Sequence, residues 1–179
     1  MLSSIFESLA ALVQPWADIF AEHTALATAV IAVHVLGMFV AGGMAIGADR
    51  AILRAPTGTA EAMRAVVADL ATTHTVVIGA LGLTVASGVA LFASDVPTFS
   101  VSKVYWIKMG CVAALLVNGL RMRRAEHTVL RRLEGAPSHT AEMPVPAPFA
   151  EWRGVRSTAM VSFILWLVTV LLGVILTNG

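Results

Sequence analysis

The residues best suited to chemistry in this sequence are a histidine and a lysine that lie within long apolar segments. His34 interrupts the apolar run 25–48, and Lys108 lies near the start of the run 102–121. An ionisable side chain inside a membrane is costly and usually serves a purpose. A neutral imidazole can ligate haem iron, and a nearby lysine can pair with a haem propionate or a quinone oxygen. The structural alternatives are that Lys108 extends to the lipid headgroups and that His34 only hydrogen-bonds a neighbouring carbonyl.

Four segments are long and apolar enough to cross a membrane, which requires about 20 residues. They are 25–48, 75–94, 102–121 and 157–177. The chain is 58% hydrophobic and only 13% charged, whereas soluble domains carry about a quarter charged residues. The short connections predict an all-α fold, an integral membrane antiparallel four-helix bundle that makes 1–179 a single membrane domain. Apolar residues at helical spacing over 2–20 predict an additional amphipathic helix on the membrane surface.

The arginines indicate how the bundle is oriented. All ten lie between the first and second spans, or between the third and fourth spans and at their edges. The positive-inside rule therefore predicts cytoplasmic Arg-bearing loops and periplasmic termini in a bacterial inner membrane. Glu7 and Asp18 interrupt the first apolar residues, so the N-terminus does not read as a signal peptide. The expected partners are the lipid bilayer and other membrane subunits, and a net charge of +1 implies no nucleic acid.

The helix rise predicts that His34 and Lys108 lie at similar depth. Both spans start on the same side, which places His34 about 13 Å and Lys108 about 6–10 Å along their helices. His74 lies about 20 Å from that level, so His34 and His74 cannot be the two axial ligands of one haem. His74 is expected to face Asn118 or to make an interfacial hydrogen bond. Asp49, next to Arg50 at the end of the first span, is expected to form a cap or an inter-helix ion pair at the cytoplasmic surface.

Small residues predict where helices approach closely. Gly43 and Gly47 form a small-xxx-small pair, and the predicted packing positions are Gly37, Gly43, Gly47, Gly79 and Gly82. The same smooth faces would also admit a flat cofactor or a partner helix. Aromatic residues near one membrane face predict an interfacial belt; they are Trp16, Phe20, Phe99, Tyr105 and Trp106. Residues 135–150 are proline-rich and are interpreted as a cytoplasmic linker.

Several function classes lack their usual residues. There is no catalytic triad, phosphate-binding loop or dinucleotide fingerprint, so no catalytic residue is assigned. The single cysteine, Cys111, excludes an internal disulfide and a cysteine-based metal motif. The eight methionines show no Met-x-x-Met spacing that would favour copper. No span has a carboxylate at its centre, which disfavours proton-coupled transport.

Two segments carry a family resemblance. HVLGMFVAGGMAIGADRAIL, starting at His34, and FSVSKVYWIKMGCVAALLVNGL resemble spans of short bacterial four-span membrane proteins of unknown function. More distantly, the arrangement is similar to copper-resistance D type proteins and to the membrane-embedded protoporphyrinogen oxidase. In the latter, a histidine on an early span and a lysine on a later span form the functional pair of a haem-binding bundle. The resemblance implies that role for His34 and Lys108.

Two functions fit these patterns. The first is a non-catalytic subunit packed within a larger membrane assembly, such as an electron-transfer or photosynthetic complex. The alternative is a b-type haem-binding redox protein or oxidoreductase, with His34 as axial ligand and Lys108 beside it.

Overall fold

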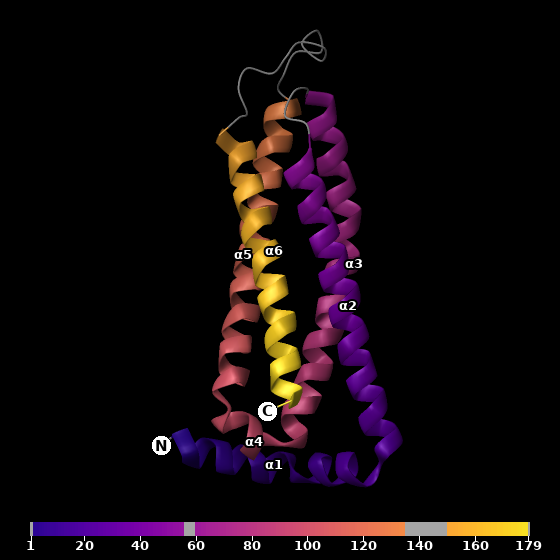
Figure 1. The fold of residues 1–179 in the computed structure, drawn as a ribbon, viewed down its shortest axis with the longest axis vertical. Helices are drawn as coiled ribbons and strands as arrows, with labels where there is room; N and C mark the ends of the chain where they lie inside the picture. Colours follow the sequence, from indigo (N-terminus) through magenta and orange to yellow (C-terminus); the bar gives the residue numbers. More distant parts are fainter. Residues whose placement is uncertain (1, 56–59, 135–149, 179) are drawn as a thin grey trace.

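A computed structural model describes residues 2–55, 60–134 and 150–178, and the described residues are helical almost throughout. Figure 1 shows the long helices side by side, with the N-terminal helix lying across one end of them. The helices are α1 (Leu2–Glu22), α2 (Thr24–Arg54), α3 (Ala60–Ser94), α4 (Val96–Val101), α5 (Lys103–Glu134) and α6 (Ala150–Asn178). The prediction of an all-α four-helix bundle with an additional N-terminal helix is confirmed.

The four long helices supply four segments that are long and apolar enough to cross a membrane. These are Thr24–Arg54, Thr73–Ser94, Lys103–Val129 and Trp152–Leu176. They match the predicted apolar runs, apart from residues 102 and 177, and extend each of them at one end or both. The helix α3 begins before its span, and α5 continues beyond its span to Glu134. The proline-rich linker, apart from Ala150, lies outside the described residues.

Neighbouring helices in the bundle run in opposite directions. The α2–α3 and α5–α6 pairs pack most extensively, α2 also packs on α6, and α3 and α5 make much less contact. The chain termini lie at the end where α1 crosses the bundle (Figure 1). We call this the α1 end. The opposite end, where α2 and α5 finish and α3 and α6 begin, is the loop end.

One hydrogen bond attaches α1 to the bundle, and another caps the start of α4. The indole Nε1 of Trp16 donates a hydrogen bond of 2.8 Å to the carbonyl oxygen of Ala90, which fixes α1 to α3. Asp95 caps α4 by accepting a bond of 3.1 Å from the amide of Thr98. The sequence analysis expected only a short loop there and missed α4. The rings of Phe99, Tyr105 and Trp106 contact one another at this end, with Phe92 beside them. Trp16 contacts Phe20 and bonds to Ala90, so the predicted aromatic residues do gather at one end.

The buried apolar residues form two separate groups. The loop-end core contains Ile52, Ala55, Leu70, Met122, Val129, Trp152, Val155 and Ala159. The smaller group, here called the midspan layer, contains Ala41, Leu115 and Trp166. Elsewhere the long helices turn many large apolar side chains outward, such as Phe39 and Leu36. That pattern is expected where lipid is the solvent.

The predicted packing glycines are only partly correct. Gly37 is buried against Ala80 and Thr84 of α3, as expected. A Cβ added at Gly43, Gly47, Gly79 or Gly82 would meet no described atom within 4 Å. The prediction that these four pack against another helix of this chain is therefore wrong. Gly42, Gly88 and Gly173 make the close approaches instead, because the rotation of each helix turns a different set of glycines inward.

Candidate functional site

His34 lies half-buried on α2 and packs against α3. Its Nδ1 lies 3.0 Å from the carbonyl oxygen of Thr84 and 3.1 Å from the hydroxyl oxygen of Ser87. A Cβ at Gly88 would approach Cε1 of the ring to 3.1 Å. The absence of a side chain at Gly88 therefore lets the imidazole lie directly on the α3 backbone.

The hydrogen bonds of His34 determine what its other nitrogen can do. A carbonyl oxygen only accepts hydrogen bonds, so Nδ1 must carry the proton that it shares with Thr84. The hydroxyl of Ser87 donates to the carbonyl of Leu83 at 2.8 Å, so Ser87 can also accept from His34. In the neutral ring, Nε2 then has a free lone pair, and no described residue makes a hydrogen bond to it. A lone pair held in this way is suited to a metal ion.

Lys108 reaches into the bundle from α5. Its Nζ would lie 3.4 Å from a Cβ at Gly173 of α6, and the terminal methyl group of Met38 of α2 would lie 3.9 Å from the same point. Gly173 thus makes room for the amine. The side chain is directed toward α2 and α6 rather than away from the bundle. Met38 follows His34 by one turn on α2, so Lys108 and His34 lie at similar depth in the bundle, as predicted. We call this arrangement the His34–Lys108 site.

Asp49 lies inside the bundle toward the loop end. It is 2% exposed, its only identified partner is the hydroxyl of Ser162 on α6, and its Oδ2 has no hydrogen-bond partner. The described residues make no ion pair with it, so the predicted surface ion pair is wrong. The sequence analysis placed Asp49 at the surface because Arg50 follows it and ends the apolar run. The helix instead turns the carboxyl inward and Arg50 outward.

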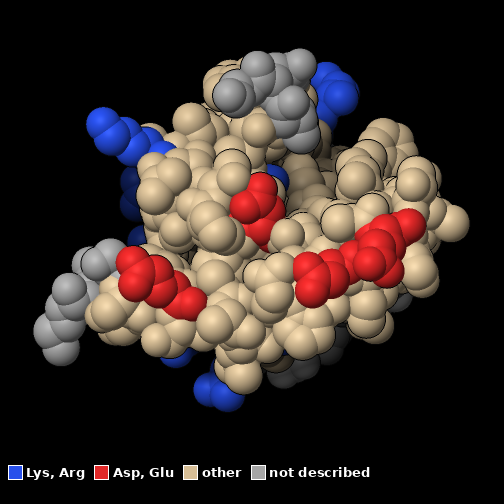
Figure 2. Space-filling view, turned by 90° about the horizontal axis from the view of Figure 1, so that it is seen from below, with Lys and Arg blue, Asp and Glu red and all other residues tan. Residues whose placement is uncertain are grey.

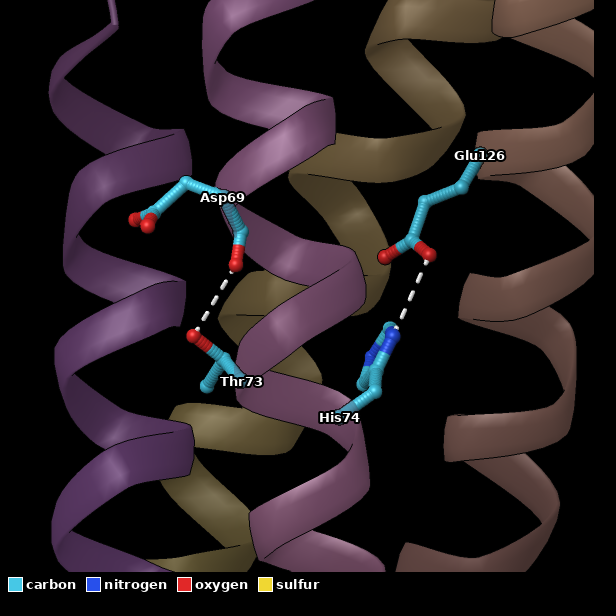
Figure 3. Close-up of polar contacts among 4 residues, drawn as sticks. All are labelled: Asp69, Thr73, His74 and Glu126. Atoms are coloured by element: carbon cyan, nitrogen blue, oxygen red, sulfur yellow. Dashed lines mark hydrogen bonds and ion pairs between the residues drawn. The ribbon is translucent and has the colours of Figure 1, made fainter.

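A second buried carboxyl belongs to Glu126 on α5. Its Oε2 lies 3.5 Å from Nδ1 of His74, and this contact joins α5 to α3 (Figure 3). Its Oε1 has no partner. Figure 3 also shows that the side chain of Asp69, on the same helix as His74, points away from Glu126 toward α2. Asn118 does not contact His74 and instead donates a bond of 2.8 Å to the carbonyl of Thr158 on α6. The expectation that His74 faces Asn118 is wrong.

The sequence contained signals for some of these missed residues. Leu115, Asn118, Met122, Glu126 and Val129 are spaced by three or four residues on α5, and all five are buried. That spacing predicts one helix face and would have placed Glu126 inward. Thr84, Ser87 and Gly88 are likewise spaced by three and four on α3. Nothing in the spacing alone shows that this face meets His34, because the relative rotation of two helices is a tertiary property.

The other histidines form no comparable group. His23 and His127 are exposed, and His139 lies outside the described residues. Within residues 2–55, 60–134 and 150–178, no three His, Cys, Asp or Glu side chains are grouped so as to hold a metal ion. A metal bound at His34 would therefore need further ligands from a cofactor.

Comparison with known proteins gives no relative from which to transfer a function. No family model, curated protein or solved structure matches this chain. Function is therefore inferred from the residues themselves.

Proposed function

We propose that this chain is an integral protein of a bacterial inner membrane, with α1 and both termini on the periplasmic side. The four candidate spans and the antiparallel bundle support membrane insertion. All ten arginines belong to the halves of the helices nearest the loop end or to the segments beyond them. Figure 2, which looks onto the α1 end, shows acidic side chains across the face and basic ones mostly at its margins. By the positive-inside rule, this charge difference supports a cytoplasmic loop end.

We further propose that the protein binds haem b, with His34 as an axial ligand. The observation that carries this proposal is the hydrogen bond from His34 Nδ1 to the Thr84 carbonyl. A histidine that ligates a metal commonly donates its other ring N–H to a carbonyl, which fixes the tautomer and the ring orientation. The same tautomer is less suited to a quinone, because a quinone carbonyl needs a donor and Nε2 would be an acceptor.

The surroundings of His34 suit a flat anionic cofactor. Gly88 and Gly173 leave the room that the imidazole and the amine occupy, so both polar groups lie within the bundle. Lys108 supplies a positive charge that can pair with a propionate. The α3–α5 seam is the least packed of the four seams in the bundle, so a ring entering there would displace little helix contact. Bound haem would supply one-electron chemistry, and this chain would set its position and potential.

The test is an absorption spectrum of the purified protein, oxidised and reduced, as isolated and after addition of haemin. We expect a Soret band that shifts on reduction and is lost in His34→Ala. His74→Ala is the matched control, since it removes another half-buried histidine of the same bundle and should keep the band. A wild-type protein that stays colourless after haemin addition would overturn the proposal. If such a protein co-purifies with stoichiometric membrane partners, the accessory-subunit hypothesis becomes the better account.

A further inference from the structure

The most unusual buried group outside the His34–Lys108 site is the carboxyl of Asp49. It is 2% exposed, and Oδ2 has no hydrogen-bond partner. Among residues 2–55, 60–134 and 150–178 no ion pair with Asp49 is found. The Arg50 side chain is exposed, and Arg156 of α6 donates its Nη2 hydrogen bond of 2.9 Å to the carbonyl of Leu53. On α3 and α5, His74 and Glu126 contact each other, with Arg123 near both.

An ionised carboxylate without a cation or several donors is costly in an apolar interior. Asp49 has one hydroxyl partner, Ser162. That single donor does not replace the hydration of a full negative charge. The carboxyl therefore needs a bound positive species, and the smallest one is a proton. A hard metal cation needs about six or more oxygen ligands, whereas the only identified side-chain oxygen beside Asp49 is that of Ser162.

Polar groups lie on the loop-end side of Asp49, and Met122 of the loop-end core separates two of them, Asn118 and Glu126, on the buried face of α5. Ser162 lies one turn from Thr158 on α6, and Asn118 donates to the Thr158 carbonyl at 2.8 Å. Asn118 lies two turns before Glu126 on α5, so both project from the same face of that helix. Glu126 then contacts His74, which is partly accessible, with 21% of its side chain exposed. Two orphan oxygens, Asp49 Oδ2 and Glu126 Oε1, mark the two ends of this series.

The opposite direction is closed by apolar groups. Trp166 follows Ser162 by one turn on α6, and Leu115 precedes Asn118 by three residues on α5. Together with Ala41 they form the midspan layer, which lies between Asp49 and the His34–Lys108 site. The indole of Trp166 also packs on Gly42, where an added Cβ would lie 3.1 Å from its Cε3.

We propose that Asp49 is a proton-binding site that exchanges its proton with the loop side of the membrane only. Asp49 lies five residues before the loop-end terminus of α2 and 25 residues after its other terminus. Asn118, Thr158 and Ser162 offer polar groups on the loop side, and the midspan layer separates Asp49 from the α1 side. This function is independent of haem, because no residue of the His34–Lys108 site takes part. The site gives the protein a group whose occupancy follows the pH of one compartment.

The test is labelling of the protein in lipid vesicles by an apolar carbodiimide, read by peptide mass spectrometry. The carboxyl O–H adds across one C=N bond of the reagent, and the adduct rearranges to a stable N-acylurea with nothing released. Only a protonated carboxyl reacts in this way. We expect an adduct at Asp49, and we expect its yield to fall by up to about tenfold per pH unit as the pH on the loop side rises. The exposed carboxyls of Asp18 and Asp95 are internal controls and should remain unlabelled.

Three results would overturn the proposal. The first is that Glu126 is labelled and Asp49 is not. The second is that labelling of the wild type follows the pH of the α1 side. The third is that sodium ions at constant pH suppress labelling as strongly as a rise in pH does. The last result would indicate a cation site. Asp49→Asn should lose the adduct, and Ser162→Ala, which keeps the carboxyl, should retain it. Trp166→Ala should make labelling respond to the pH on both sides, whereas Trp166→Phe should keep the response one-sided.

Discussion

The two ends of the bundle differ in what holds them together. At the loop end, eight residues from all four long helices form a continuous apolar core, and Trp152, Val155 and Ile52 are fully buried. At the α1 end, below the midspan layer, the interior contains an imidazole, an amine and several glycines. The loop-end core is large and apolar, whereas the His34–Lys108 site is small and polar.

The difference follows from the solvent on each side. Ile52 and Ala55 lie beyond the point where the apolar run of α2 ends at Asp49, so their burial removes apolar surface from water. Within lipid that driving force is absent, and helices associate through close packing and hydrogen bonds. Gly37, Gly42 and Gly88 supply that close packing. The loop end is therefore expected to carry most of the stability, and the α1 half is left free to carry a binding site.

Trp152→Ala is expected to cause the largest loss of stability. Trp152 is 0% exposed within the loop-end core, and truncating a buried tryptophan costs about 3–5 kcal/mol. Its Nε1 has no partner, so Trp152→Phe loses no hydrogen bond and should cost much less. Thermal unfolding in detergent, followed by circular dichroism, measures both. Equal losses for the two variants would mean that packing volume is not what Trp152 contributes.

Gly42→Leu should have an intermediate effect and tests packing within the spans. A Cβ at Gly42 meets the indole of Trp166 at 3.1 Å, and overpacking typically costs about 1–3 kcal/mol. Gly43→Leu is the matched control, because the adjacent glycine meets no described atom within 4 Å. Both changes exchange glycine for leucine inside one helix, so their propensity gains cancel. Similar unfolding temperatures for the two variants would contradict the observed rotation of α2.

Trp16→Phe should have a smaller and more local effect. It removes the hydrogen bond of 2.8 Å from the indole to the Ala90 carbonyl, and such a bond contributes about 0.5–1.5 kcal/mol. We expect faster amide hydrogen exchange across α1 and an almost unchanged unfolding temperature for the bundle. Ile19→Ala, at an exposed position of α1, serves as the control. A large drop in the unfolding temperature would show that α1 is part of the bundle's cooperative unit.

The sequence was sufficient to predict the architecture but not which side chains point into the bundle. Hydropathy and helix rise predicted four spans, the surface helix and the common depth of His34 and Lys108, because these depend on length along one helix. The inward carboxyl of Asp49 and the His74–Glu126 contact depend on how each helix is rotated about its axis. For the same reason, Gly43 and Gly47 were wrongly assigned to packing although their spacing was right. Small-residue spacing identifies a smooth face without showing what covers it.

Lys108→Met should have the smallest effect on stability, and that result would complete the contrast between the two ends. Methionine has a similar shape, and replacing a buried charge with an apolar side chain is often neutral or stabilising. We expect a change within about 1 kcal/mol, or a gain. If the amine serves a ligand, the same variant should weaken haemin binding while Lys103→Met, at an exposed position, leaves it unchanged. A marked loss of stability in Lys108→Met would instead make the amine a structural group that joins α5 to α6 at Gly173. If Lys108→Met keeps its stability but loses haemin binding, then Lys108 contributes to ligand binding and not to the stability of the fold.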